Sequence, residues 1–518
     1  MLSSLHKNAL YRGVISVLWF LMLVGLPLTS FPILSRLTGA VVAPFSAIPL
    51  GILIVIWLLP YLVEQRTFPV EVVPLMYFIL ISLIVSALAF FLDGYYDLGR
   101  DFFDQTLRAY LTVAIGLSFY LFFSVFHRTE SAFRKTFLFI YIGGILLILW
   151  SIVEVYLLRN IARAFHLPRG FLTIRSALAV QSPSMLFTNR VTGFAYEPSW
   201  FVRQFNLVLF PIWLAAVFQR ESLFKLRLWI FQVEDLLLIA GLVVFGYSSP
   251  RIGLVALFAS LAFLGLLVLQ RIHQFFTRWV QARFKTPPNR LIWVRIILAA
   301  VMLVIMLTLI SGALSWYIGF ASQWDYRFAL LERESTSNVL ELFSLSETEI
   351  IYRARDLAFY ERVIFWLGGW HIFNDYPFGV GLGNAGFYFM DRMHGAAFES
   401  YEMRNLIYRA DYLANTKNLW TRLLSETGFI GLAAFLVWLY LLWRSAALVR
   451  KHGSKTLQWV GLSGQLFLLA YLVEGFSMDS FAMPYEWIMA GLISAAGVLV
   501  RQKLMLRDKP VVLASAQP

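Results

Sequence analysis

The sequence predicts an all-α polytopic membrane protein. Of its 518 residues, 59% are hydrophobic and only 14% are charged, whereas about 25% of residues are charged in an average soluble protein. Apolar runs of roughly 20 residues follow one another along the chain, and a helix of about that length crosses the hydrocarbon core of a bilayer. So many such runs argue against the buried helices of a soluble fold, and we expect about 12 transmembrane helices.

The apolar runs give approximate bounds for each helix. The first follows a polar start with no small-residue cleavage site, so we expect a retained span and not a removed signal peptide. The seventh and eighth are joined by a tight turn at Ser248-Ser249-Pro250. The twelve expected spans are 13–32, 40–63, 70–92, 106–126, 135–157, 198–218, 229–248, 251–270, 291–316, 418–443, 457–476 and 482–501.

Lysine and arginine in short loops predict the orientation, because such loops carry these residues on the cytoplasmic side. With the N-terminus inside, the inside loops and the tail are rich in them, while the short outside loops hold Arg36 and Arg100. Both termini are therefore expected in the cytoplasm. The inside cations are Arg66, Arg128, Arg134, Lys135, Arg220, Lys225, Arg227, Arg271, Arg278, Arg283, Lys285, Arg290, Arg444, Arg450, Lys451, Lys455, Arg501, Lys503, Arg507 and Lys509.

Two long outside segments break this pattern. We expect helices 1–9 within 1–316, including an outside segment at 158–197, then a large outside loop at 317–417, and helices 10–12 with the tail within 418–518. Periodicity predicts helices at Leu330–Leu342 and Glu347–Leu367 in the large loop. Both outside segments are rich in arginine, which indicates either a positive external cleft or simply solvated loops.

The stretch from Arg190 to Ser199 concentrates polar groups beside an apolar run. It contains Arg190, Gly193, Glu197 and Pro198. Proline is tolerated in a first helical turn, so a membrane helix is expected to begin at Pro198. The start of a helix carries partial positive charge that suits a phosphate. The stretch therefore indicates an anion site, or alternatively a loop in which Glu197 only caps its own helix.

Two further arginines are expected near the same face of the membrane. Arg203 follows Pro198 by five residues, and Arg251 opens the helix after the Ser248 turn. An arginine within a membrane helix is costly and points to function. A cation at a helix start also opposes the helix dipole, so local structure does not require Arg251 there. We expect Arg190, Arg203 and Arg251 to converge.

The large loop supplies the remaining candidate residues. Arg353, Arg355 and Arg362 lie on its expected helices. The glycines of 377–384 are better explained by a closely packed backbone turn than by a nucleotide-binding loop, because no strand precedes them. Lys417 and Asn418 stand at the outer start of the tenth span. There Lys417 is either a ligand-facing cation or an interfacial lysine.

Several functions are disfavoured by residue content. With no cysteine there is no disulfide or thiolate site. No His pair at i, i+4 and no Asp-x-Asp occurs, so neither a metal nor another cofactor is indicated. The net charge of +13 is better explained by the cytoplasmic loops and the outside arginines than by nucleic-acid binding.

Four motifs in this order resemble the O-antigen ligase/polymerase superfamily, which contains Wzy-type polymerases and O-antigen ligases. They are Arg190-x-x-Gly193-x-x-x-Glu197-Pro198-Ser199, Ser249-Pro250-Arg251-x-Gly253, Pro377-x-Gly379-Val-Gly381-Leu-Gly383-Asn384, and Asn418 followed by Leu424-x-Glu426-Thr-Gly428-x-Ile-Gly431. The resemblance covers about 190–445. It implies a GT-C-like, metal-independent glycosyltransferase in the bacterial inner membrane, with a periplasmic site that uses polyprenyl-diphosphate-linked glycans.

One departure from the family pattern bears on the reaction. Ligases of this superfamily typically carry a His-Asn pair before the tenth helix, and here Lys417 stands in the place of that histidine. This favours a polymerase of O-antigen or exopolysaccharide repeats over a ligase that transfers glycan to lipid A core. A lipid-linked glycan transporter or flippase is the alternative of another class. Expected partners are the lipid-linked glycan and membrane lipids, with a chain-length regulator left open.

The chemistry of such a transfer suits the candidate residues. Negative charge develops on the leaving diphosphate, and arginine remains charged and binds phosphate oxygens in pairs. We therefore expect Arg190, Arg203, Arg251 and Arg362 to bind the diphosphate, with Lys417 as a further cation. Arg353, Arg355 and Asn418 complete the expected substrate-binding residues. Glu197 is the expected acceptor of the proton, with Arg190 and Arg251 as its catalytic partners.

Overall fold

The computed structural model describes residues 8–65, 67–93, 95–97, 100–160, 168–182, 190–248, 251–284, 288–323, 325–334, 346–409 and 413–507. Each of the twelve expected spans overlaps a helix or a run of contiguous helices, although some bounds differ: α2 ends at Val24 and not at residue 32, and α4 begins at Ala47 and not at residue 40. Within these residues, ten are long and apolar enough to cross a membrane. The other two, α2 (Ala9–Val24) and α12 (Val233–Ser248), have 16 residues each and rise about 24 Å, somewhat less than a hydrocarbon core. The predicted all-α polytopic class is confirmed.

The ten longer spans include two that are built from several elements. One joins α4 (Ala47–Leu53), η1 (Ile54–Leu58) and α5 (Leu59–Gln65), and the other joins α10 (Pro198–Gln204), η4 (Phe205–Leu209) and α11 (Phe210–Gln219). The remaining eight are α6 (Val72–Asp93), α7 (Phe102–Phe126), α8 (Glu130–Asn160), α13 (Arg251–Phe284), α14 (Pro288–Ala321), α20 (Leu419–His452), α21 (Lys455–Glu474) and α22 (Pro484–Arg507).

The helix α10–η4–α11 forms the centre of the bundle. Of its apolar window, 89% is buried, compared with 78% for α21 and 61% for α22. The π-helical turn η4 is one of the irregularities that often occur near functional sites. In η4, Asn206 donates to the Gly253 carbonyl at 2.9 Å and to the Glu474 carboxylate at 2.6 Å. Three spans are thereby held together around one buried amide.

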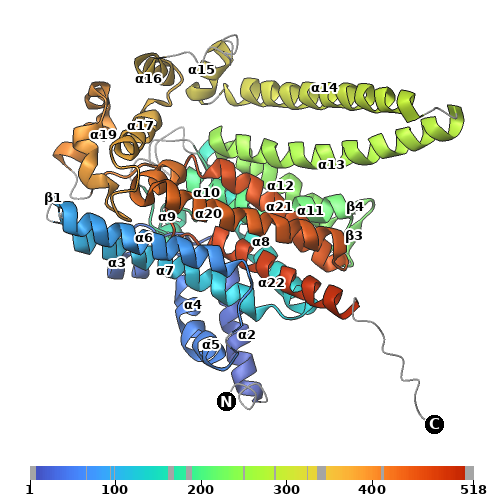
Figure 1. The fold of residues 1–518 in the computed structure, drawn as a ribbon, viewed down its shortest axis with the longest axis horizontal. Coiled ribbons are helices and arrows are strands. Elements are labelled where there is room, and N and C mark those ends of the chain that lie inside the picture. The colour runs from blue at the N-terminus through green and yellow to red at the C-terminus, as the bar shows by residue number, and fades with distance from the viewer. Residues whose placement is uncertain are drawn as a thin grey trace.

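The helices α13 and α14 form an antiparallel arm at the edge of the bundle (Figure 1). Only 6% of the apolar window of α14 is buried, so nearly all of its hydrophobic surface is left for lipid. The C-terminal end of α14 leads into α15 (Tyr326–Glu334), which lies with the other short helices of the large loop. The arm thus connects the lipid-facing edge of the protein to the loop.

Two short hairpins lie at opposite ends of the bundle (Figure 1). The hairpin of β1 (Tyr96–Asp97) and β2 (Arg100–Asp101) lies on the side of the large-loop helices. The hairpin of β3 (Arg227–Leu228) and β4 (Phe231–Gln232) lies at the other end. The segments expected on opposite sides of the membrane are therefore at opposite ends of the molecule.

The large loop is mostly helical. It contains α15, α16 (Glu347–Asp356), α17 (Tyr360–Asp375), η6 (Ala385–Tyr388), α18 (Phe389–Arg392), η7 (Gly395–Glu399) and α19 (Tyr401–Tyr408). The single helix expected at Glu347–Leu367 is wrong, because the chain breaks between α16 and α17, where Ala358 adopts a φ of 51°. The expected helix at Leu330–Leu342 is observed only as far as Glu334, and its remainder lies outside the described residues.

The glycine run packs against a kink in α20. Gly379, Gly381 and Gly383 all have φ between 88° and 95°, and Gly428 inside α20 has a φ of 67°. A Cβ on Gly379 would lie 2.6 Å from the Gly428 nitrogen. The amide of Gly381 also donates to the Glu426 carbonyl at 3.0 Å. The predicted use of these glycines for close backbone packing is confirmed, and the packing attaches the large loop to the bundle.

Candidate active site

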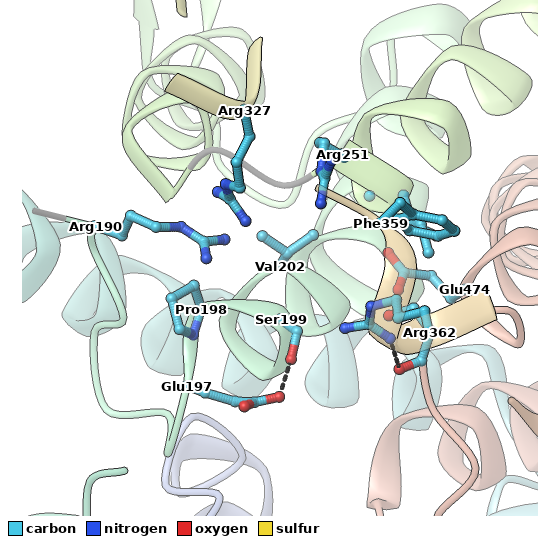
Figure 2. Close-up of a pocket in the computed structure, with 13 residues that line it drawn as sticks. Arg190, Glu197, Pro198, Ser199, Val202, Arg251, Arg327, Phe359, Arg362 and Glu474 are labelled. Atoms are coloured by element: carbon cyan, nitrogen blue, oxygen red, sulfur yellow. Dashed lines mark hydrogen bonds between the residues drawn. The ribbon is translucent and has the colours of Figure 1, made fainter. Parts of the chain in front are cut away.

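A cavity between the bundle and the large loop is lined by four arginines and two glutamates. The arginines come from four separate segments, and Figure 2 shows Arg190, Arg251 and Arg327 directed toward one another above Val202. Three of the four, Arg190, Arg251 and Arg362, are among the residues expected to bind a diphosphate. The charged lining residues are Arg190, Arg251, Arg327, Arg362, Glu197 and Glu474.

The turn that carries Arg190 is held by a buried carboxylate. Glu154 of α8 accepts from the Gly193 amide at 2.8 Å and from Arg175 at 2.9 Å. Arg175 belongs to α9 (Arg169–Leu178). Gly193 has a φ of 57°, and a Cβ there would come within 2.7 Å of Leu147. The turn therefore requires glycine at this position. Next to this turn, the Arg190 side chain donates to the Ser248 carbonyl at 2.8 Å.

Arg251 joins the first turn of α13 to the large loop. Its guanidinium donates to the Leu357 and Ala358 carbonyls, to the latter at 2.6 Å, and lies 5.4 Å from the Phe359 ring centroid. These carbonyls end α16, and a cation is favourable at a helix C-terminus. The conflict between Arg251 and the dipole of its own helix is thus offset by a second helix.

Arg327 and Arg362 complete the cluster from the loop side. Arg362 of α17 donates to the Ser477 carbonyl at 2.9 Å. Arg327 of α15 pairs with Asp325, with 2.9 Å from Nε to Oδ1. Arg327 is not among the residues expected at the site, although it is one of the many loop arginines. Nothing in its local pattern distinguishes it, because the α13–α14 arm is what carries it to the cavity.

The cluster carries more positive than negative charge in a poorly solvated place. Burial, together with the nearby Arg327, lowers the pKa of Arg190 to about 9. Burial also lowers the pKa of Arg362. Burial alone would raise the pKa of Asp325, but its hydrogen bond and charge interaction with Arg327 lower it. Arginine retains its proton in proteins. The lowered pKa values of Arg190 and Arg362 therefore mean that their positive charges are poorly stabilised in this site, and a bound anion would stabilise them.

The two carboxylates are held differently. Glu197 occupies the N-cap position of α10, which begins at Pro198 as predicted, yet its side chain caps no backbone amide. It accepts from the Ser199 hydroxyl instead and lines the cavity (Figure 2). The simple capping alternative is therefore not what the structure has. Glu474 is 1% exposed and accepts from Asn206.

Arg203 does not line the cavity. Its guanidinium is 1% exposed and pairs with Glu486 of α22 at 3.2 Å, deep among the spans. The expected convergence of Arg190, Arg203 and Arg251 is thus found for Arg190 and Arg251 only. The physical reason is helix geometry, because a residue five positions after Pro198 is turned toward α22 and away from Arg251.

The other predicted substrate-binding residues do not line the cavity. Lys417 pairs with Glu402 and lies 4.4 Å from the centroid of the Phe365 ring. Asn418 caps α20, accepting from the Trp420 and Thr421 amides. On α16, Arg355 pairs with Glu399 at 2.7 Å, and Arg353 is half-buried. Ser249 and Pro250 lie outside the described residues.

The fold and the cavity define a multi-pass membrane protein with a cationic, carboxylate-containing site. Residues 236–436 match the protein-family model described as O-antigen ligase. This match confirms the resemblance to the O-antigen ligase/polymerase superfamily, whose members are membrane glycosyltransferase-like enzymes. The matched segment contains Arg251, Arg327 and Arg362, whereas Arg190 and Glu197 precede it. No curated protein matches the chain.

The Arg203–Glu486 pair generates a stability prediction. Truncating one partner of a buried ion pair leaves an uncompensated charge and typically costs about 3–5 kcal/mol. Arg203→Ala should therefore lower the amount of folded protein in membranes and its thermal midpoint in detergent. The double variant Arg203→Met, Glu486→Leu should recover both. A well-folded double variant without activity would instead show that the Arg203–Glu486 pair is needed for the reaction.

Proposed function

We propose that the protein is a glycan polymerase of the bacterial inner membrane. It would join polyprenyl-diphosphate-linked oligosaccharide repeats into O-antigen or exopolysaccharide on the periplasmic side. The observation that carries this proposal is the cluster of Arg190, Arg251, Arg327 and Arg362 beside two carboxylates. The positive charge of this cluster exceeds its negative charge, which suits a diphosphate, and arginines bind phosphate oxygens in pairs.

The transfer needs little more than this cavity supplies. The acceptor hydroxyl oxygen forms a bond to the anomeric carbon of the donor sugar, while the bond from that carbon to the diphosphate oxygen breaks. The lipid diphosphate leaves with the bonding electrons, and its growing charge is stabilised by the arginines, which are already in place. The hydroxyl proton passes to a carboxylate.

Glu197 is the better placed proton acceptor of the two cavity carboxylates. It lies at the N-terminus of α10, lines the cavity and accepts a hydrogen bond from the Ser199 hydroxyl. Glu474 is almost fully buried and is occupied by Asn206 and the helix packing around it. We therefore assign Glu197 to proton transfer and Glu474 to balancing charge beside Arg362.

An O-antigen ligase is the second candidate, because that is the description of the matching family. Lys417 stands where ligases typically carry a histidine, and this favours the polymerase. The two functions separate on a gel of lipopolysaccharide from a deletion strain. Loss of a polymerase leaves single repeat units attached to the core, whereas loss of a ligase leaves none. Purified protein that elongates lipid-linked repeats would also set the polymerase apart from a transporter.

Removal of a cavity arginine should abolish polymer. Arg190→Ala and Arg251→Ala are each expected to reduce polymer in a complementation assay at least 100-fold, since loss of one preorganised charge stabiliser costs about that much. Protein levels are measured in the same membranes. Arg404→Ala is the matched control, because Arg404 is an exposed arginine of the same loop. Wild-type polymer lengths in both cavity variants would contradict the assignment.

Glu197→Gln should separate binding from turnover. The amide preserves the shape but cannot accept the proton, so turnover is expected to fall by about 100-fold or more while the lipid-linked donor still binds. Single-turnover kinetics with purified protein measure the two steps independently. Unchanged turnover would leave Glu197 with a structural role only.

The pH profile tests the charge of Lys417. Burial and the nearby Arg362 lower the pKa of Lys417 to about 8, even though Glu402 contacts its ammonium group. If Lys417 acts as a cation, kcat/KM should decline as pH rises through about 8, because the free enzyme then loses that charge. Lys417→Arg should remove this decline. A kcat/KM that rises through the same range would indicate that neutral Lys417 is a base.

A further inference from the structure

A second charged cavity lies at the opposite end of the bundle from the candidate active site. It is formed where the segment before α6 meets the ends of α20 and α22. Its lining combines four basic side chains with one acidic side chain and an apolar wall. The lining residues are Val70, Glu71, Leu441, Arg444, Ser445, Ala447, Leu448, Lys451, His452 and Arg501.

The acidic residue of this groove is already neutralised. Glu71 is completely buried, and Arg501 donates to both of its oxygens, at 2.9 and 3.1 Å. The Ser445 hydroxyl donates to the same carboxylate. The pair joins α22 to the start of α6 and leaves Arg444 and Lys451 as the charges that the groove presents. Both side chains are exposed.

The basic residues continue an apolar stripe on α20. Val437, Tyr440, Arg444, Leu448 and Lys451 recur at spacings of three and four residues, so they share one face of the helix. Val437 and Tyr440 are 49% and 58% exposed, as side chains facing lipid would be. Along this face, a hydrophobic surface therefore passes directly into a cationic groove.

We propose that this groove binds an anionic phospholipid, with the phosphate between Arg444 and Lys451 and an acyl chain along Val437 and Tyr440. Basic pockets between membrane helices on the cytoplasmic side suit anionic head groups. Cations at helix ends on that side are also expected from the loop-charge rule and the helix dipole. Neither effect requires a cavity or an aligned apolar stripe, and these two features identify an amphiphile. The site is independent of the proposed reaction.

Lipid binding to delipidated, full-length protein in detergent tests the proposal. Phosphatidylglycerol, phosphatidylethanolamine with the same acyl chains, and inorganic phosphate are compared by native mass spectrometry and by the thermal midpoint. We expect phosphatidylglycerol to be retained and to raise the midpoint. Arg444→Gln, Lys451→Gln should weaken its apparent affinity about tenfold or more. Glu71 and Arg501 are left unchanged because they hold helices together.

The matched control is Arg278→Gln, Arg283→Gln, which removes the same charge from exposed positions of α13 at the same end. This control should bind phosphatidylglycerol like the wild type. Equal weakening in both double variants would show non-specific surface attraction and overturn the site. An equal response to inorganic phosphate would overturn the lipid as the ligand, as would equal retention of phosphatidylethanolamine.

Discussion

Four arginines line one cavity, and the repulsion among their charges is the constraint on which one end of this molecule depends. Like charges that line one cavity repel each other more strongly than they would in bulk water, because the effective dielectric constant of protein sites is lower. The structure offsets this cost with oriented oxygen atoms. Arg190, Arg251 and Arg362 each donate to backbone carbonyls, and Arg327 pairs with Asp325. These bonds fix the positions of the charges without neutralising them all.

The same contacts connect the large loop to the membrane bundle. Arg251 donates a hydrogen bond to a carbonyl at the break between α16 and α17. Arg362 of α17 donates one to a carbonyl in the segment between α21 and α22. After the C-terminal end of α17, the glycine run packs against the kink of α20 at Gly428. The cavity is therefore a joint between two parts of the chain. An anion that binds there would contact both the membrane bundle and the large loop. Its binding would therefore stabilise the position of the loop against the bundle.

Buried carboxylates have a recurring role in this chain. Glu154 organises the turn that carries Arg190, Glu474 holds Asn206 beside the start of α13, and Glu71 joins α6 to α22. Each accepts hydrogen bonds from groups on other elements, as buried charges must. A charged residue within a span is thus not by itself a sign of catalysis. Arg203, paired with Glu486, is the clearest example.

The sequence by itself determined the membrane class, the twelve helical segments and the start of α10 at Pro198. Hydrophobic length and proline chemistry are local properties, so they can be read along the chain. It also indicated Arg190, Arg251, Arg362 and Glu197. Arg190 and Glu197 lie beside an expected helix start, Arg251 opposes the dipole of its own helix, and Arg362 belongs to the arginine-rich large loop. Only the tertiary structure decided that Arg203 faces α22 and that Arg327 reaches the cavity. Both depend on how helices rotate and pack against distant partners, and a residue's neighbours in sequence carry no record of that.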